Sequence, residues 1–213
     1  MSDPDHSEAV EHLRDADPVM AGIIERVGPC MLGSRTDRGG PAHDHYGALV
    51  RAIVGQQLSV SAARSIYGRL TDRYGGRTPT PAQLLADDPE AVRAAAGLSR
   101  SKVVFLRDLG ERLDSRDLRL DDIEDAPDDE VARRLLEVKG VGQWTVDMYL
   151  IFHLGRPDVL PVGDLGIRRA AMLSYGLRKL PRPERLVKLA RPWRPWRSAG
   201  SWYLWASLRA LPS

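Results

Sequence analysis

From residue 46 onward, apolar side chains recur at the three- and four-residue spacing of amphipathic helices. In residues 46–76, Leu49 and Ile53 mark one apolar stripe, Ile66 and Leu70 mark a second, and a short polar break at 55–58 separates them. In the later segments, prolines at the first turn of a helix and glycines at its end mark where successive helices begin and end. No segment shows sustained alternation of polar and apolar residues. The pattern predicts an all-α protein with about ten helices.

Length and composition indicate a globular protein. The chain has 213 residues, of which 43% are hydrophobic and 28% charged, enough for one compact unit or two small lobes with a real core. Cys30 is the only cysteine, which excludes an internal disulfide and a four-cysteine zinc or iron–sulfur site. With no secretory pattern and no apolar run long enough to cross a bilayer, we expect a cytoplasmic protein, nucleoid-associated if bacterial, and a monomer.

Charge is unevenly distributed along the chain. The net charge is only +2, but acidic residues crowd residues 1–18 and 121–130, whereas arginines crowd the last fifty residues. A polyanion would therefore meet a local basic face, although an ordinary solvated rim explains the same arginines. We expect residues 1–18 to be a flexible acidic tail or a frayed helix.

A glycine turn joins two helical patterns at residues 136–146, LEVKGVGQWTV. Gly140 and Gly142 permit positive φ and place no side chain between the backbone and a partner, so amides at the start of the next helix can face a phosphate. Such a turn binds a nucleic-acid backbone without reading its sequence. The alternative is a simple corner between two helices, whose glycines only allow close packing.

Three ordered motifs extend this turn into a longer pattern. They are LEVKGVGQWTVDMYLIFHLGRPDVLPVGDLG at 136–166, IVGQQLSVSAARSI at 53–66 and RPWRPWRSAGSWYLW at 191–205. Together they resemble the helix-hairpin-helix–GPD superfamily of DNA glycosylases, and within it the AlkA-like 3-methyladenine-DNA glycosylase II type. The chain would be a short form, since its first forty-odd residues leave no room for the extra β-domain of longer members.

The resemblance implies a two-lobed helical fold with a DNA cleft between the lobes. One lobe would span residues 46–156 and contain the hairpin, and the other would combine residues 19–45 with 157–213. The implied partner is double-stranded DNA that contains alkylated bases. The implied activity is base excision repair by nucleotide flipping, with hydrolysis of the N-glycosidic bond of purines such as 3-methyladenine or 7-methylguanine.

Asp164 is the expected catalytic residue. Cleavage leaves positive charge on the sugar, and a fixed carboxylate beside C1′ stabilises that charge in the transition state. Whether Asp164 acts as a base toward water or mainly electrostatically stays open. The plain alternative is helix capping, because an aspartate directly before LGIRRAA is a good N-cap, and one residue can do both.

The resemblance also assigns the other site residues. Trp144, Met148 and Trp205 would line the base pocket, where aromatic faces attract a cationic purine. Members that cut the DNA strand carry a lysine two positions after the second hairpin glycine, where this chain has Trp144, so it should be monofunctional. The residues expected at DNA are Gln56, Gln57, Leu58, Lys139, Gly140, Val141, Gly142, Thr145 and Arg197. For Arg197 a packed Pro–Trp corner explains the segment equally well.

Among these, Gln57 with Leu58 would fill the gap left by the flipped nucleotide, although residues 56–58 taken alone favour a polar turn between helices. No side-chain metal site is expected, but backbone carbonyls of the hairpin could hold a monovalent Na⁺ or K⁺. The rival functions are a glycosylase for oxidised or mismatched bases and a non-catalytic helix-hairpin-helix DNA-binding module. Preference among alkylated bases depends on pocket shape, which the sequence does not specify.

Overall fold

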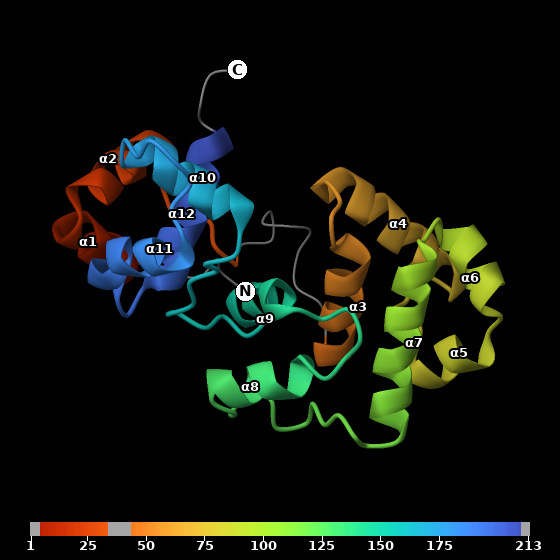
Figure 1. The fold of residues 1–213 in the computed structure, drawn as a ribbon. Coiled ribbons are helices and arrows are strands. Elements are labelled where there is room, and N and C mark those ends of the chain that lie inside the picture. The colour runs from red at the N-terminus through yellow and green to blue at the C-terminus, as the bar shows by residue number, and fades with distance from the viewer. Residues whose placement is uncertain (1–4, 34–43, 210–213) are drawn as a thin grey trace. The chain divides into compact units, whose positions relative to one another are not determined.

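The computed structural model describes residues 5–33 and 44–209, and this part of the chain is helical without any strand (Figure 1). The all-α prediction is therefore confirmed, with twelve α-helices in the described residues rather than about ten. The elements are α1 (Ser7–Ala16), α2 (Pro18–Val27), α3 (His45–Gly55), α4 (Val60–Arg73), α5 (Pro81–Ala86), α6 (Pro89–Ala96), α7 (Arg100–Asp114), α8 (Asp128–Leu135), α9 (Gln143–Phe152), α10 (Leu165–Ser174), α11 (Pro183–Leu189), the 3₁₀ turn η1 (Arg191–Trp193) and α12 (Arg197–Arg209).

The described residues form two compact units. Residues 44–149, here the hairpin unit, hold α3 to α8 and most of α9. Residues 5–33 together with 150–209, here the Asp164 unit, hold α1, α2 and α10 to α12. The expected lobe ran from 46 to 156, so the structure ends it seven residues earlier, within α9.

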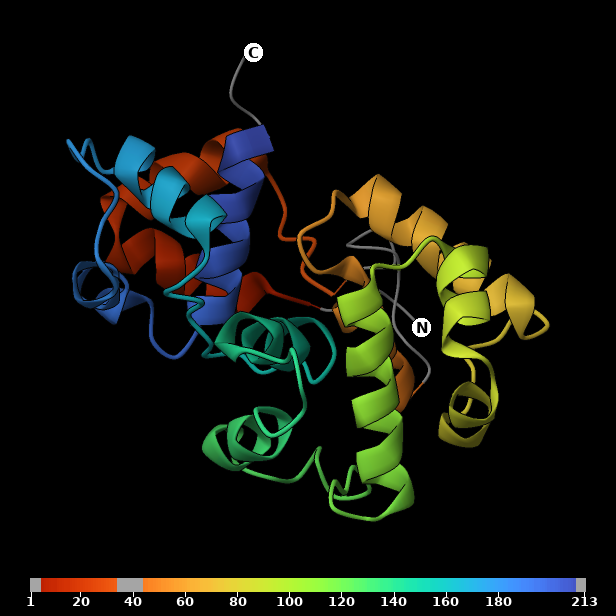
Figure 2. The same cartoon turned by 45° about the vertical axis from the view of Figure 1, so that its right-hand side comes forward.

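The hairpin unit is built around α3 and α7. In it α5 packs on α7, α4 packs on both α3 and α6, and α3 also contacts α7, as Figure 2 shows from a second direction. Leu49 and Ile53 of α3 and Leu106 and Leu109 of α7 are fully buried between them. Ser, Thr and Asp side chains cap the starts of α3 to α7.

The Asp164 unit packs α2 and α10 against α12, with α1 against α2 and η1. Residues 1–18 were expected to be a flexible tail or a frayed helix, and the flexible tail is wrong for residues 7–16, which form α1. Leu13 of α1 is fully buried, so its apolar face is held by tertiary packing that charge content alone does not reveal. Asp17, between the two helices, accepts hydrogen bonds from the amides of Val19 and Met20 and from the Trp193 indole, which stops α1 and starts α2.

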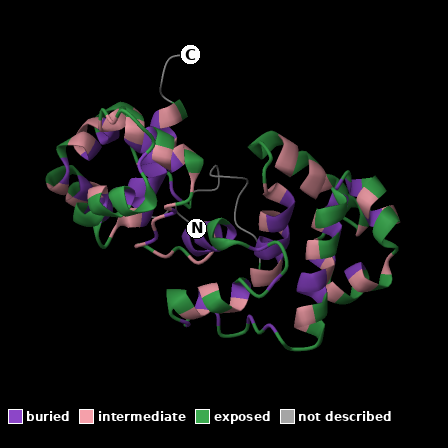
Figure 3. Ribbon diagram, viewed as in Figure 1, coloured by how far each residue is buried: buried purple, intermediate pink, exposed green. Residues whose placement is uncertain are grey.

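Burial follows the helical periodicity (Figure 3). Each peripheral helix shows buried positions on one side and exposed positions on the other, whereas Ser198 to Leu204 of α12 are buried throughout. In the described ranges, 5–33 and 44–209, no helix combines the length and apolar character that crossing a bilayer requires.

Candidate functional site

The glycine turn joins α8 to α9 in the hairpin unit. Gly140 adopts φ +76°, and the Val141 amide donates to the Val138 carbonyl at 3.0 Å, which closes the turn. A Cβ on Gly140 would lie 2.1 Å from the Phe105 ring of α7. Two independent constraints therefore require glycine here, the positive φ and the lack of space for a side chain. Val141 itself is buried, which makes it a structural part of the turn.

Gly142 differs from the prediction, because its φ is not in the positive region. An added Cβ there would meet no atom within 4 Å, so the backbone faces open space. The amides of Gly142 and Gln143 donate to no acceptor in the described part of the chain, as is usual for the first turn of a helix. This arrangement suits a phosphate oxygen at the N-terminus of α9.

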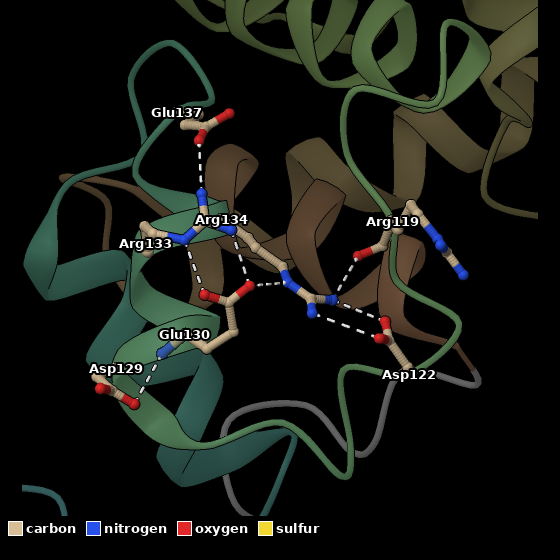
Figure 4. A network of polar contacts seen from close by, with 7 residues as sticks. All are labelled: Arg119, Asp122, Asp129, Glu130, Arg133, Arg134 and Glu137. Carbon is tan, nitrogen blue, oxygen red and sulfur yellow. Dashed lines mark hydrogen bonds and ion pairs between the residues drawn. The ribbon is translucent and has the colours of Figure 1, made fainter.

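The α8 side of the hairpin is stabilised by an ion-pair network (Figure 4). Glu130 accepts from Arg133 and Arg134, and Arg134 also bonds Asp122 at 2.7 Å in the preceding loop. The two arginines hold the pKa of the Glu130 carboxyl at about 2, below its ordinary value. These pairs fasten α8 to the segment before it, so the hairpin starts from a constrained helix.

Asp108 of α7 holds the last residue before the turn. Its Oδ2 accepts the backbone amide of Lys139 at 2.9 Å, and its Oδ1 lies 3.3 Å from the Lys139 ammonium. Burial opposes ionisation of Asp108, but the Lys139 amide, Arg112 and the Lys139 ammonium outweigh it and keep its pKa below the ordinary value. The Lys139 side chain is mostly exposed, as a phosphate contact requires, and within the described residues it pairs with this carboxylate.

The loop between α3 and α4 is joined to the hairpin by Gln56. Its side-chain amide donates to the Gly140 carbonyl at 2.8 Å and to the Thr145 hydroxyl at 3.1 Å. Thr145 is buried, so its hydroxyl supports this loop and is not on the surface expected to meet DNA. Gln57 and Leu58 are exposed, and Gln57 has φ +58°, which is uncommon for a residue other than glycine.

Asp164 is the N-cap of α10 in the Asp164 unit. Its Oδ1 accepts the Ile167 amide at 2.8 Å and the Trp205 indole N–H of α12 at 2.9 Å. The capping interpretation is therefore confirmed. The second bond adds what the sequence did not show, a tryptophan from a distant helix that fixes the orientation of the same carboxylate.

Two residues beside Asp164 were missed as site residues. The Phe152 ring packs against Trp205 with centroids 5.7 Å apart, and this contact also restrains the indole. A Cβ on Gly166 would lie 3.0 Å from Asp164 Oδ1 and 3.3 Å from Trp205 Cδ1, so a glycine leaves room for the indole to reach the carboxylate. The spacing Asp-x-Gly was the available signal in the sequence.

The other expected pocket residues, Trp144 and Met148, lie on α9 in the hairpin unit. Trp144 is 37% exposed, whereas Met148 is 7% exposed and largely part of the core. The convergence of these side chains with Trp205 on one base stays a prediction, as does a DNA cleft between the two lobes.

Arg197 does not have the role expected of it. Its Nε donates to Asp158 Oδ1 at 2.6 Å, and its Nη2 donates to Asp158 Oδ2 and to the Asp158 carbonyl. The side chain is only 16% exposed. A guanidinium bound in this way holds the loop before Asp164 to the start of α12, which favours the packed-corner role over a phosphate contact.

In the described part of the chain, neither a metal cluster nor the pocket beside the start of α3 coincides with these residues. In the ranges 5–33 and 44–209, no group of three His, Cys, Asp or Glu side chains could hold a metal ion. An open pocket of about 940 Å³ in the hairpin unit is lined by the start of α3, residues 78–81 and residues 113–121. It contains none of the predicted site residues, and the site therefore rests on the geometry of the hairpin and Asp164.

Comparison with known proteins supports the assignment of these motifs. The family model described as "HhH-GPD superfamily base excision DNA repair protein" matches residues 50–195. "Alkylbase DNA glycosidase-like protein mag2" of Schizosaccharomyces pombe is 32% identical over 95% of this chain and 94% of its own length. "DNA-3-methyladenine glycosylase 1" of the same organism is 33% identical over 93% of this chain and 86% of its own length.

A solved structure gives the same result. The structure of S. pombe 3-methyladenine DNA glycosylase (Mag1) in complex with abasic DNA superposes with a TM-score of 0.85 at 32% identity, and covers 97% of this chain and all of that one. The similarity of fold thus extends over nearly the whole length of both chains. On this evidence the chain belongs to the HhH-GPD superfamily of base excision DNA repair proteins.

Proposed function

We propose that this DNA glycosylase hydrolyses the N-glycosidic bond of alkylated purines in duplex DNA and leaves the strand uncut. The observation that carries the proposal is the Asp164 carboxylate, which two N–H donors hold at one oxygen beside an indole ring. The names of the S. pombe relatives, an alkylbase glycosidase-like protein and a 3-methyladenine glycosylase, support the substrate class.

The chemistry asks for a fixed anion rather than a strong acid. An N3- or N7-alkylated purine is already positively charged, so it departs without protonation and positive charge develops on the sugar. Because the N–H groups of Ile167 and Trp205 both bind Oδ1, the carboxylate is already oriented. It therefore does not have to reorganise as the positive charge develops on the sugar. The same anion can orient the attacking water.

Recognition of the base then falls to aromatic faces. The exposed ring of Trp144 and the indole of Trp205 can each stack on a cationic purine, a contact of about 0.5–2 kcal/mol. Trp144 also occupies the position where strand-cutting members carry a lysine. With no amine there to form a Schiff base, the product is an abasic site in an intact strand.

Backbone amides of the hairpin provide the grip on DNA. Gly142 and Gln143 present N–H groups at the start of α9, and Lys139 adds a positive charge beside them. A Na⁺ or K⁺ ion at the hairpin carbonyls, a monomeric state and a cytoplasmic location are part of the same proposal.

Base release from methylated duplex DNA tests the proposal. Wild-type protein should release 3-methyladenine or 7-methylguanine, and the strand should break only after alkali. Asp164→Asn is the matched variant, because asparagine is an equally good N-cap and its one carbonyl oxygen can accept both N–H groups. We expect release to fall about 10²–10³-fold, the usual effect of removing one electrostatic contact to the transition state.

Other outcomes identify the rivals. If neither protein releases base while both bind DNA, the chain is a binding module without the chemistry. Release of oxidised or mismatched bases, but of no alkylated purine, would assign it to another substrate class. If Asp164→Asn cleaves as fast as wild type, the carboxylate serves only as a helix cap.

A further inference from the structure

One face of α7 contacts both parts of the hairpin unit that are expected to touch DNA. Lys102, Phe105 and Asp108 follow one another at three-residue spacing, so they project from the same side of the helix. Phe105 lies against Gly140 and Asp108 accepts the Lys139 amide, which places both on the hairpin. Lys102 lies one turn earlier and reaches the loop between α3 and α4.

Lys102 closes the end of α3. Its ammonium donates to the carbonyl of Val54 at 2.8 Å and to the carbonyl of Gln56 at 2.9 Å. Carbonyls in the last turn of a helix lack intrahelical partners and carry partial negative charge, so a cation that binds two of them fixes the chain as it leaves the helix. The next residue is Gln57, which must hold its left-handed backbone conformation at φ +58°.

That conformation needs support from the surroundings. Residues other than glycine do not favour positive φ. Such a conformation persists where contacts on both sides of the residue fix the backbone. Lys102 holds the Gln56 carbonyl, while the Gln56 side chain binds Gly140 and Thr145 of the hairpin. The loop is therefore tied to α7 through its backbone and to the hairpin through its side chain.

We propose that Lys102 is a positioning residue for nucleotide flipping, which holds the exposed Gln57–Leu58 tip at a set distance and angle from the hairpin that grips the strand. This inference rests on the proposed glycosylase function, and concerns the step before bond cleavage. In this role Lys102 contacts neither the base nor the sugar. Its ammonium acts through the Val54 and Gln56 carbonyls alone.

Two substitutions separate positioning from general stability. Lys102→Met keeps the length of the side chain and removes both donated hydrogen bonds, whereas Lys102→Arg keeps a cation with two N–H groups that can reach the carbonyls. Lys188→Met, at an exposed position of α11 in the other unit, is the control for the loss of one positive charge. Melting temperatures are measured for all four proteins.

The main measurement is the single-turnover release of 7-methylguanine from two duplexes. In one duplex the base is paired with cytosine, and in the other it lies opposite a tetrahydrofuran abasic analogue, where flipping costs less because no pair is broken. We expect Lys102→Met to slow release from the paired duplex about 10- to 100-fold, the range for misplacement by a residue remote from the chemistry. On the unpaired duplex the loss should be several times smaller, and Lys102→Arg should recover most of the rate.

An equal loss on both duplexes, or no loss on either, overturns the proposal. A second signal does not depend on turnover: 2-aminopurine placed opposite the abasic analogue reports by its fluorescence whether a protein tip has entered the stack. Wild type should raise the fluorescence, and Lys102→Met should raise it less. If the wild type releases no base at all, the glycosylase proposal fails by itself, and an unchanged fluorescence response in Lys102→Met would then also reject the positioning role.

Discussion

Replacing Gly140 by alanine should destabilise the hairpin unit far more than the same change at Gly142. At Gly140 the new Cβ would stand 2.1 Å from the Phe105 ring, on a backbone with φ +76°. The left-handed conformation costs an alanine about 1–2 kcal/mol, and overpacking against the ring adds about 1–3 kcal/mol. At Gly142 the Cβ meets nothing within 4 Å and φ is not positive, so neither cost arises.

The total for Gly140→Ala is thus about 2–5 kcal/mol, which corresponds to a fall in melting temperature on the order of 10 °C in a chain of this size. Gly142→Ala should melt within a degree or two of wild type. It should nevertheless weaken binding to abasic DNA, because its methyl group projects into the space where a phosphate would approach the amides of Gly142 and Gln143.

Phe105→Ala provides the internal check. Without the ring, only the backbone cost remains, so Gly140→Ala should cost about 1–3 kcal/mol less in the Phe105→Ala background than in the wild type. Urea unfolding of the four proteins in this cycle measures the difference. If the cost of Gly140→Ala is the same in both backgrounds, the ring contact is irrelevant and the reasoning is refuted.

Two further predictions concern stability. Asp17→Ala leaves the buried Trp193 indole and the Tyr175 hydroxyl without their acceptor and removes an N-cap, so urea unfolding should show a loss of about 2–5 kcal/mol, and a loss below about 1 kcal/mol would contradict it. Glu130 has its pKa lowered from 4.5 to about 2 by two arginines, so its contribution is present above pH 4.5 and is lost as the pH falls toward 2. Melting curves of wild type and Glu130→Gln should therefore differ at pH 7 and converge toward pH 2, and a gap that is independent of pH would exclude the ion pairs as its cause.

Local interactions explain what could be predicted from the sequence. The helices after residue 44 follow from apolar periodicity and from caps that lie within a few residues of the positions they stabilise. Asp164 belongs to this group, because its capping bond to Ile167 spans three residues. The glycine turn also belongs to this group. Only the structure shows that, of its two glycines, Gly140 has the positive φ and Gly142 does not.

Interactions between distant segments explain what was wrong or missed. In its arginine-rich segment Arg197 reads equally as a DNA contact or as part of a packed corner, and it binds Asp158, which lies 39 residues earlier in the chain. Residues 7–16 read as an acidic tail, but their apolar side packs against α2 and η1. In both cases the residue types are compatible with a solvent-exposed role and with an internal one. The distant segment that each contacts in the fold determines which role it has.

The sequence by itself determined the helical class, the superfamily motifs and the identity of the candidate carboxylate, because periodicity, capping and glycine conformation act within a few residues. Only the tertiary structure decided that Trp205 orients Asp164, that Arg197 is internal and that Lys102 holds the loop of Gln57. Such contacts join residues 39 to 46 positions apart, and chain folding, not local preference, sets which of them meet.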